Sequence, residues 1–96
     1  MSTVIVKQFP SSVSFFDVRT VEQVRALKEK YLTVGEVQIP EVGEDAAEEM
    51  FDLMNNPNRV DESVKLFGNV RSLSVGDIVL VDGVEYTCLP IGWCVL

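Results

Sequence analysis

The chain contains no histidine, and it has only two cysteines among its 96 residues. Without histidine there are no imidazole ligands for zinc, no Ser-His or Cys-His nucleophile pairs, and no copy of the commonest general base. Cys88 and Cys94 fit neither a disulfide framework nor a C-x-x-C site, so we expect two reduced thiols that pack as small hydrophobic side chains. These absences favour a protein that is not an enzyme and that has no cofactor and no metal site.

Long hydrophobic runs are also missing. No apolar run reaches the 18 residues typical of a membrane-spanning helix, and the stretch M-S-T-V-I-V-K-Q-F-P lacks the basic region and the long apolar core of a signal peptide. We therefore expect a cytoplasmic protein without a membrane partner. The length and the 47% hydrophobic content predict one α+β domain over residues 1–96. Because so small a domain buries a limited share of its surface, homo-oligomers are compatible with its size.

Basic residues are scarce in one part of the chain. The protein has 15 acidic and 8 basic residues, which gives a net charge of −7. From Leu32 to Asn58 there is no lysine or arginine, whereas there are seven acidic residues: Glu36, Glu41, Glu44, Asp45, Glu48, Glu49 and Asp52. The field of such a segment opposes binding to a nucleic-acid backbone, so we expect no direct contact with nucleic acid.

The best-defined structural pattern lies near the C-terminus. Two strand-like runs, Asp77–Val81 and Val84–Cys88, are separated by Asp82-Gly83, a pair that favours a type I′ hairpin turn. This turn sets the register, with the last residue of the first run opposite the first residue of the second. Leu89–Gly92 predicts another turn, and Trp93–Leu96 predicts a third strand with Trp93 in the core.

The N-terminal half predicts a strand, a helix and a strand. Thr3–Phe9 is a strand candidate that Pro10 ends, and Val34–Ile39 is the next one. Between them, Thr20 and Gln23 form a capping-box pattern, followed by apolar residues at helical spacing, so a helix is expected over about residues 21–31. Because strand, helix and strand follow one another, we expect a right-handed crossover with the two strands parallel. The segment 13–18 fits either a short strand or an extended tether.

A second helix is expected from Glu44 or Asp45 to about Met54. Its expected buried stripe consists of Ala47, Met50, Phe51 and Met54. Asn55-Asn56-Pro57 predicts its end, because asparagine tolerates the left-handed cap and proline cannot continue the helix. Residues 58–69 are expected to form a polar connection. Together these elements predict about five strands, with a C-terminal antiparallel meander, and two helices packed on one face.

Two motifs of this chain resemble the end of small proteins that are common in bacteriophages and mobile elements. The first is S-L-S-V-G-D-I-V with the D-G turn and the closing G-W, and YodL-like domains have a related ending. The second is A-E-E-M-F-D-L-M-N-N-P, which resembles the acidic helix and the Asn-Asn stop that precede this ending. The resemblance covers about residues 31–96. It implies a phage or mobile-element accessory protein, and it implies no activity and no catalytic residue.

The acidic outer side of the second helix is the main candidate for a binding surface. This side and the loop before it carry Glu41, Glu44, Asp45, Glu48, Glu49 and Asp52. A basic patch on a host protein, such as a nucleic-acid-binding enzyme or a component of a defence system, would complement it. The alternative is an ordinary solvated helix face. The acids lack the loop spacing of an EF-hand, so we expect no metal site among them.

A second set of polar residues lies near the two motifs. This set consists of Asn55, Asn56, Arg59, Arg71, Ser72 and Ser74. They either line a small site or, as we favour, form capping and turn hydrogen bonds. Overall we expect a non-enzymatic phage or mobile-element protein that binds a host macromolecule through the acidic helix face, as a candidate inhibitor of that macromolecule. The alternative is a structural or self-assembling module without a host target, which uses an exposed sheet edge or Trp93.

Overall fold

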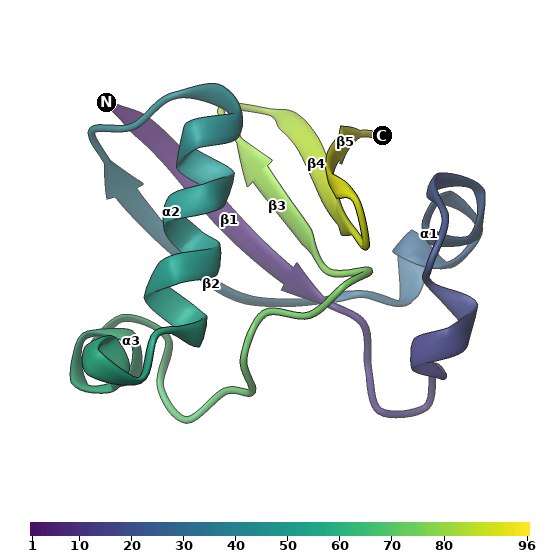
Figure 1. Ribbon diagram of the computed structural model, residues 1–96, viewed down its shortest axis with the longest axis horizontal. Coiled ribbons are helices and arrows are strands. Elements are labelled where there is room, and N and C mark those ends of the chain that lie inside the picture. The colour runs from purple at the N-terminus through teal and green to yellow at the C-terminus, as the bar shows by residue number, and fades with distance from the viewer.

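A computed structural model describes residues 1–96 and contains one five-stranded antiparallel sheet and three α-helices (Figure 1). The strands are β1 (Ser2–Gln8), β2 (Leu32–Ile39), β3 (Ile78–Val81), β4 (Val84–Leu89) and β5 (Gly92–Val95), in the spatial order β2-β1-β3-β4-β5. The helices are α1 (Val21–Leu27), α2 (Gly43–Asn55) and α3 (Val60–Phe67), with 3₁₀ helices η1 (Phe15–Asp17), η2 (Lys28–Lys30) and η3 (Pro57–Arg59). The expected α+β class and the five strands are confirmed.

The first strand of the chain is an interior strand of the sheet. β1 pairs with β2 on one side and with β3 on the other, and both pairings are antiparallel. The expected parallel arrangement of β1 and β2 is therefore wrong. The physical reason is that residues 9–31 turn back beyond one end of the sheet instead of crossing along it, so that β2 begins with Leu32 opposite Gln8, the last residue of β1.

The predicted C-terminal meander is confirmed. Asp82 and Gly83 have φ angles of 47° and 87°, as a type I′ turn requires, and Val81 lies opposite Val84. A second two-residue turn, at Pro90 and Ile91, returns the chain as β5. Local residue chemistry thus sets the register of three strands.

α2 lies across one face of the sheet and forms most of the core with it (Figure 1). Its buried side chains are Ala46, Ala47, Met50, Leu53 and Met54, and they pack with Val4, Val6, Val79 and Val81 of the sheet. Phe51, which was expected in the buried stripe, is 37% exposed. Leu53 takes its place, because residue 53 lies on the same side of a 3.6-residue helix as residues 46 and 50, whereas residue 51 lies at the edge.

Residues 58–69 were expected to form a polar connection, and this expectation is wrong. They form η3 and α3, and α3 packs beside α2 and over β2 on the same face of the sheet. Phe67, the last residue of α3, is buried in the core. The missed signal was the helical spacing of Val60, Val64 and Phe67 before Gly68, whose φ of 75° suits a helix end.

The two expected helices do not share one face of the sheet. Val24 of α1 forms a small second core with Val18, Tyr31 and Ile78, whereas Val79 packs under α2. Because adjacent strand residues point to opposite faces, α1 packs on the face opposite α2. That second face is covered only at the end where residues 9–31 turn, to the right in Figure 1.

The ends of the helices follow local side-chain chemistry. The capping box at Thr20 and Gln23 is confirmed, and α2 ends at Asn55 as expected. Asn56 has a φ of −79°, however, so it is not a left-handed cap, and its side chain instead accepts a hydrogen bond at the start of η3. Residues 13–18 form no strand and contain η1. None of the helices has both the length and the hydrophobicity to cross a membrane.

Candidate functional site

The predicted acidic residues lie along the outer side of α2 and in the loop before it. Glu44 and Asp45 are exposed in the first helical turn, where negative charge suits the helix dipole. Acidic residues of α3 extend the same charged layer. We call this layer the acidic surface, and it consists of Glu41, Glu44, Asp45, Glu48, Glu49, Asp52, Asp61 and Glu62.

One arginine holds part of the acidic surface together. The Arg59 guanidinium lies 2.8 Å from a carboxylate oxygen of Glu49, 2.7 Å from one of Asp52 and 3.0 Å from one of Glu62. These three carboxylates raise the pKa of Arg59, and the hydrogen bond from Arg59 lowers the pKa of Glu62. One guanidinium does not balance three carboxylates, so the cluster keeps an excess of negative charge. The sequence did not predict this ion-pair cluster, because Arg59 lies just outside the segment without basic residues.

A second contact ties the acidic surface to the edge of the sheet. The indole N–H of Trp93, in β5, donates a hydrogen bond to Glu48. The Trp93 ring is half-buried and packs against the core, as expected. Glu41, Glu44 and Asp45 form no ion pair or side-chain hydrogen bond in the chain. Asp61 of α3 also has no such partner, so these four carboxylates are the part of the acidic surface that is free to bind a partner.

The charge of the whole molecule is concentrated in this layer. Residues 41–62 contain eight acidic residues and one basic residue, which gives −7, and the rest of the chain contains seven of each sign. At the other end of the molecule, residues 19–30 around α1 carry four basic and two acidic residues. Figure 1 shows α2 and α3 on one side of the molecule and α1 on the other. The molecule thus has one strongly acidic side and one weakly basic end.

The second polar set does not form one small site. Asn55 donates to the carbonyl of Leu73 (2.9 Å) and accepts from its N–H (2.8 Å), so it fixes the segment before β3 to the end of α2. Arg71 forms two hydrogen bonds to Asp77, of 2.7 and 2.8 Å, and its guanidinium lies 4.4 Å from the centre of the Phe9 ring. These contacts agree with the capping and turn interpretation.

Asp77 is the one fully buried carboxylate of the chain, with 0% exposure. Burial raises its pKa above the ordinary value for aspartate, and the hydrogen bonds from Arg71 and from the N–H groups of Ser74 and Phe9 oppose that rise. A buried carboxylate in a cleft would be a catalytic candidate. Neither cavity of the molecule is lined by Asp77, so its position fits a structural anchor.

The two cysteines point to opposite faces of the sheet. Cys88 is buried under α2, whereas Cys94 lies opposite Thr87 on the other face, and both thiols are free. Burial raises the pKa of Cys88 to about 11. No three cysteine, aspartate or glutamate side chains are arranged to hold a metal ion.

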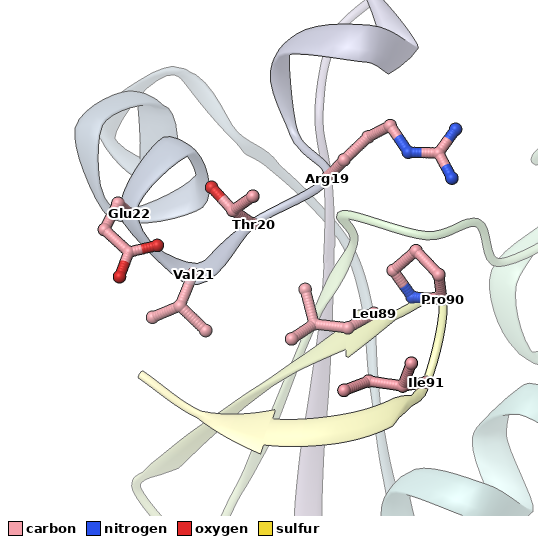
Figure 2. A pocket seen from close by; sticks show the side chains of 7 residues that line it. All are labelled: Arg19, Thr20, Val21, Glu22, Leu89, Pro90 and Ile91. Atoms are coloured by element: carbon pink, nitrogen blue, oxygen red, sulfur yellow. The ribbon is translucent and has the colours of Figure 1, made fainter.

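A groove of about 400 Å³ lies between the start of α1 and the turn that joins β4 to β5 (Figure 2). Its lining residues are Arg19, Thr20, Val21, Glu22, Leu89, Pro90 and Ile91. A smaller cavity of about 150 Å³ lies beside α3. The groove has no signal in the sequence, because its two walls are separated by more than 60 residues of chain.

The acidic surface and the groove are the two candidate sites that the fold presents. The first was predicted from the charge of the chain, and the second comes from the fold. Comparison with protein-family models, with curated proteins and with solved structures gives no match to this chain.

Proposed function

We propose that the protein is a non-enzymatic accessory protein that binds a basic host protein through its acidic surface. The observation that carries this proposal is the concentration of the whole net charge in residues 41–62. Like charges held together repel one another, and four of them have no partner within the chain to offset that repulsion: Glu41, Glu44, Asp45 and Asp61. A cationic surface of another protein would supply the missing opposite charge.

The class of partner follows from the same charge. Proteins that handle nucleic acids present grooves lined with lysine and arginine, and an acidic surface complements such a groove. Charge complementarity also speeds the encounter of the two proteins. A protein bound there competes with nucleic acid and so inhibits the host protein. The phage or mobile-element setting, and with it the cytoplasm of the host cell, rests on the resemblance of the C-terminal motifs.

The test uses charge reversal at three of the four free carboxylates, those in the first turn of α2 and in the loop before it. The tagged protein, a Glu41→Lys/Glu44→Lys/Asp45→Lys variant and a control variant are used to capture proteins from nuclease-treated bacterial lysate, followed by mass spectrometry. The control reverses three exposed acidic residues elsewhere, Asp17, Glu29 and Glu36, so that both variants have the same net charge.

We expect one basic protein to bind the natural chain and the control variant but not the variant at the acidic surface. The purified partner should then bind more weakly as the salt concentration rises, and DNA or RNA should compete with the binding. Equal capture by the two charge-reversed variants would contradict the proposal.

A second candidate function is self-assembly through a sheet edge. β2 and β5 each have a neighbour on one side only, and β2 is eight residues long, with Glu36 as its one charged residue and no proline or lysine. Such an edge has few of the features that prevent pairing with another strand. Trp93 is not available for this role, because its ring packs on the core. Monomeric behaviour at high protein concentration would rule this alternative out.

A further inference from the structure

The groove between α1 and the β4–β5 turn has an apolar floor and charged ends. Val21 lies on one wall and Leu89, Pro90 and Ile91 form the other (Figure 2). Ile91 is 96% exposed, so its side chain contributes almost nothing to the core of the fold. With Val21, Leu89 and Pro90 it forms an exposed apolar patch, and such patches occur at binding sites.

Arg19 gives the groove an unpaired positive charge at one end. Its side chain has no carboxylate partner in the chain, and its guanidinium lies 4.9 Å from the centre of the Phe15 ring. Contact with an aromatic ring restricts an arginine side chain while its N–H donors stay available. Glu22 lies on the same wall at the other end of the groove, so the two charges give the groove a direction (Figure 2).

We propose that this groove binds an extended segment of a partner polypeptide in which an apolar side chain stands next to an acidic one. The apolar side chain contacts Leu89, Pro90 and Ile91, and the acidic side chain pairs with Arg19. A basic side chain at the Arg19 end is disfavoured by repulsion, and an acidic one at the Glu22 end is disfavoured in the same way. The groove is at the opposite end of the molecule from the acidic surface and selects the opposite charge.

The volume fits this occupant. A cavity of about 400 Å³ is within the usual range for sites that bind small molecules or short peptide segments. The groove has one guanidinium, that of Arg19, and an apolar wall next to it, so the recognition chemistry at this end is one carboxylate beside one apolar group. A polypeptide supplies both groups on neighbouring residues. Its chain can also extend beyond the Glu22 end of the groove along the surface.

The test is a titration of the full chain, labelled with ¹⁵N, with blocked tripeptides. We expect acetyl-Leu-Leu-Glu-amide to shift the amide resonances of Val21, Leu89 and Ile91. The neutral peptide acetyl-Leu-Leu-Gln-amide should bind about threefold more weakly, which is the order of one exposed ion pair. Equal binding of the two peptides, or shifts confined to other parts of the molecule, would overturn the proposal.

Substitutions in the groove separate the apolar contribution to peptide binding from the contribution of the Arg19 charge. Ile91→Ser should weaken the binding of both peptides about tenfold, because it removes most of the apolar contact at that wall. Its melting temperature should not change, since the side chain is exposed. Arg19→Gln should abolish the difference between the glutamate and the glutamine peptide, and Arg19→Glu should shift the preference to acetyl-Leu-Leu-Lys-amide. Arg25→Gln, an exposed residue of α1 that does not line the groove, is the matched control and should bind as the natural chain does.

Two further measurements distinguish a polypeptide from the other molecules that could occupy the groove. Binding of N-acetyl-leucine as tight as that of the glutamate peptide would overturn the polypeptide as occupant in favour of a small organic acid. Resonances that depend on protein concentration without peptide, and lose this dependence in Ile91→Ser, would overturn it in favour of a second copy of the chain. The variant with lysine at residues 41, 44 and 45 should bind the peptides normally, so the outcome here is independent of the proposed function.

Discussion

Asp77 connects the segment before β3 to the end of β1, which is far away in the sequence. Its carboxylate accepts hydrogen bonds from both guanidinium N–H groups of Arg71, from the N–H of Ser74 before β3, and from Gln8 and Phe9 at the end of β1. Buried charges are stable in proteins when this many donors replace the lost water. A single residue thus fixes where β1 ends and where β3 begins.

Replacement of Asp77 should therefore destabilise the fold strongly. We expect Asp77→Ala to lower the free energy of unfolding by about 3 kcal/mol, because Arg71 and the buried donors lose their acceptor. Asp77→Asn keeps the shape and one acceptor oxygen, and its loss should be smaller. Urea unfolding followed by circular dichroism measures both values, with the exposed, unpaired Glu29→Ala as control. A midpoint for Asp77→Ala equal to that of the control would contradict this role.

At the scale of elements, α3 is held against β2 by one close contact. A Cβ atom on Gly35 of β2 would lie 2.3 Å from Cδ1 of the Phe67 ring, which is buried at the end of α3. No side chain fits there unless the ring moves. Gly35 is therefore a requirement of helix packing, since its backbone has no positive φ angle.

Gly35→Ala should destabilise the protein by about 1–3 kcal/mol, the usual cost of overpacking a core. Phe67→Leu alone should also destabilise it, because a smaller side chain leaves a cavity. In the double variant the leucine makes room for the new methyl group, so the combined loss should be smaller than the sum of the two single losses. Thermal or urea unfolding of the four proteins gives this coupling, and strictly additive losses would show that the two residues do not interact.

Elements defined by neighbouring residues could be predicted from the sequence. The Asp82-Gly83 turn set the register of β3 and β4, and the capping box at Thr20 marked the start of α1. The acidic surface could be predicted as well, because charge is a sum over residues and needs no knowledge of contacts. For the turn and the capping box, the interactions that determine the structure lie within a few residues of chain.

Features that depend on distant segments could not be predicted in this way. The direction of β2 depends on where residues 9–31 travel, and the pairing of Arg59 with Glu49 depends on how α3 returns beside α2. The groove lies between the start of α1 and a turn near the C-terminus, so no local sequence pattern predicts it. α3 is the exception, because the helical spacing of Val60, Val64 and Phe67 was present in the sequence.

At the scale of the whole molecule, two buried groups make the fold sensitive to alkaline pH. Burial raises the pKa of Cys88 from 9.0 to about 11, and burial with the nearby Asp77 charge raises the pKa of Tyr31, whose hydroxyl donates to the carbonyl of Gly76. Above pH 9 the unfolded chain therefore releases protons that the folded chain still holds. The stability that these two groups contribute is fully present below pH 9. It is lost as the pH rises through their pKa values in the folded protein.

We expect the free energy of unfolding to fall by about 2 kcal/mol between pH 9 and pH 11 from Cys88 alone, since each pKa unit corresponds to about 1.4 kcal/mol. Urea unfolding at a series of pH values measures this slope. Cys88→Ala is less stable at neutral pH, but its slope should be shallower, with the remaining part due to Tyr31. An identical slope in the natural chain and in Cys88→Ala would show that the thiol does not contribute.

The interior position of β1 also matters while the protein is being synthesised. β1 leaves the ribosome before the other strands of the sheet, and one of its two neighbours, β3, begins only at Ile78. Before β3 emerges, the nascent chain can pair β1 with β2 and cover Val4 and Val6 with α2, but the side of β1 that faces β3 has open backbone hydrogen-bonding groups. Those groups can pair with a strand of another chain, so the sheet is protected from such pairing only after the C-terminal hairpin has emerged.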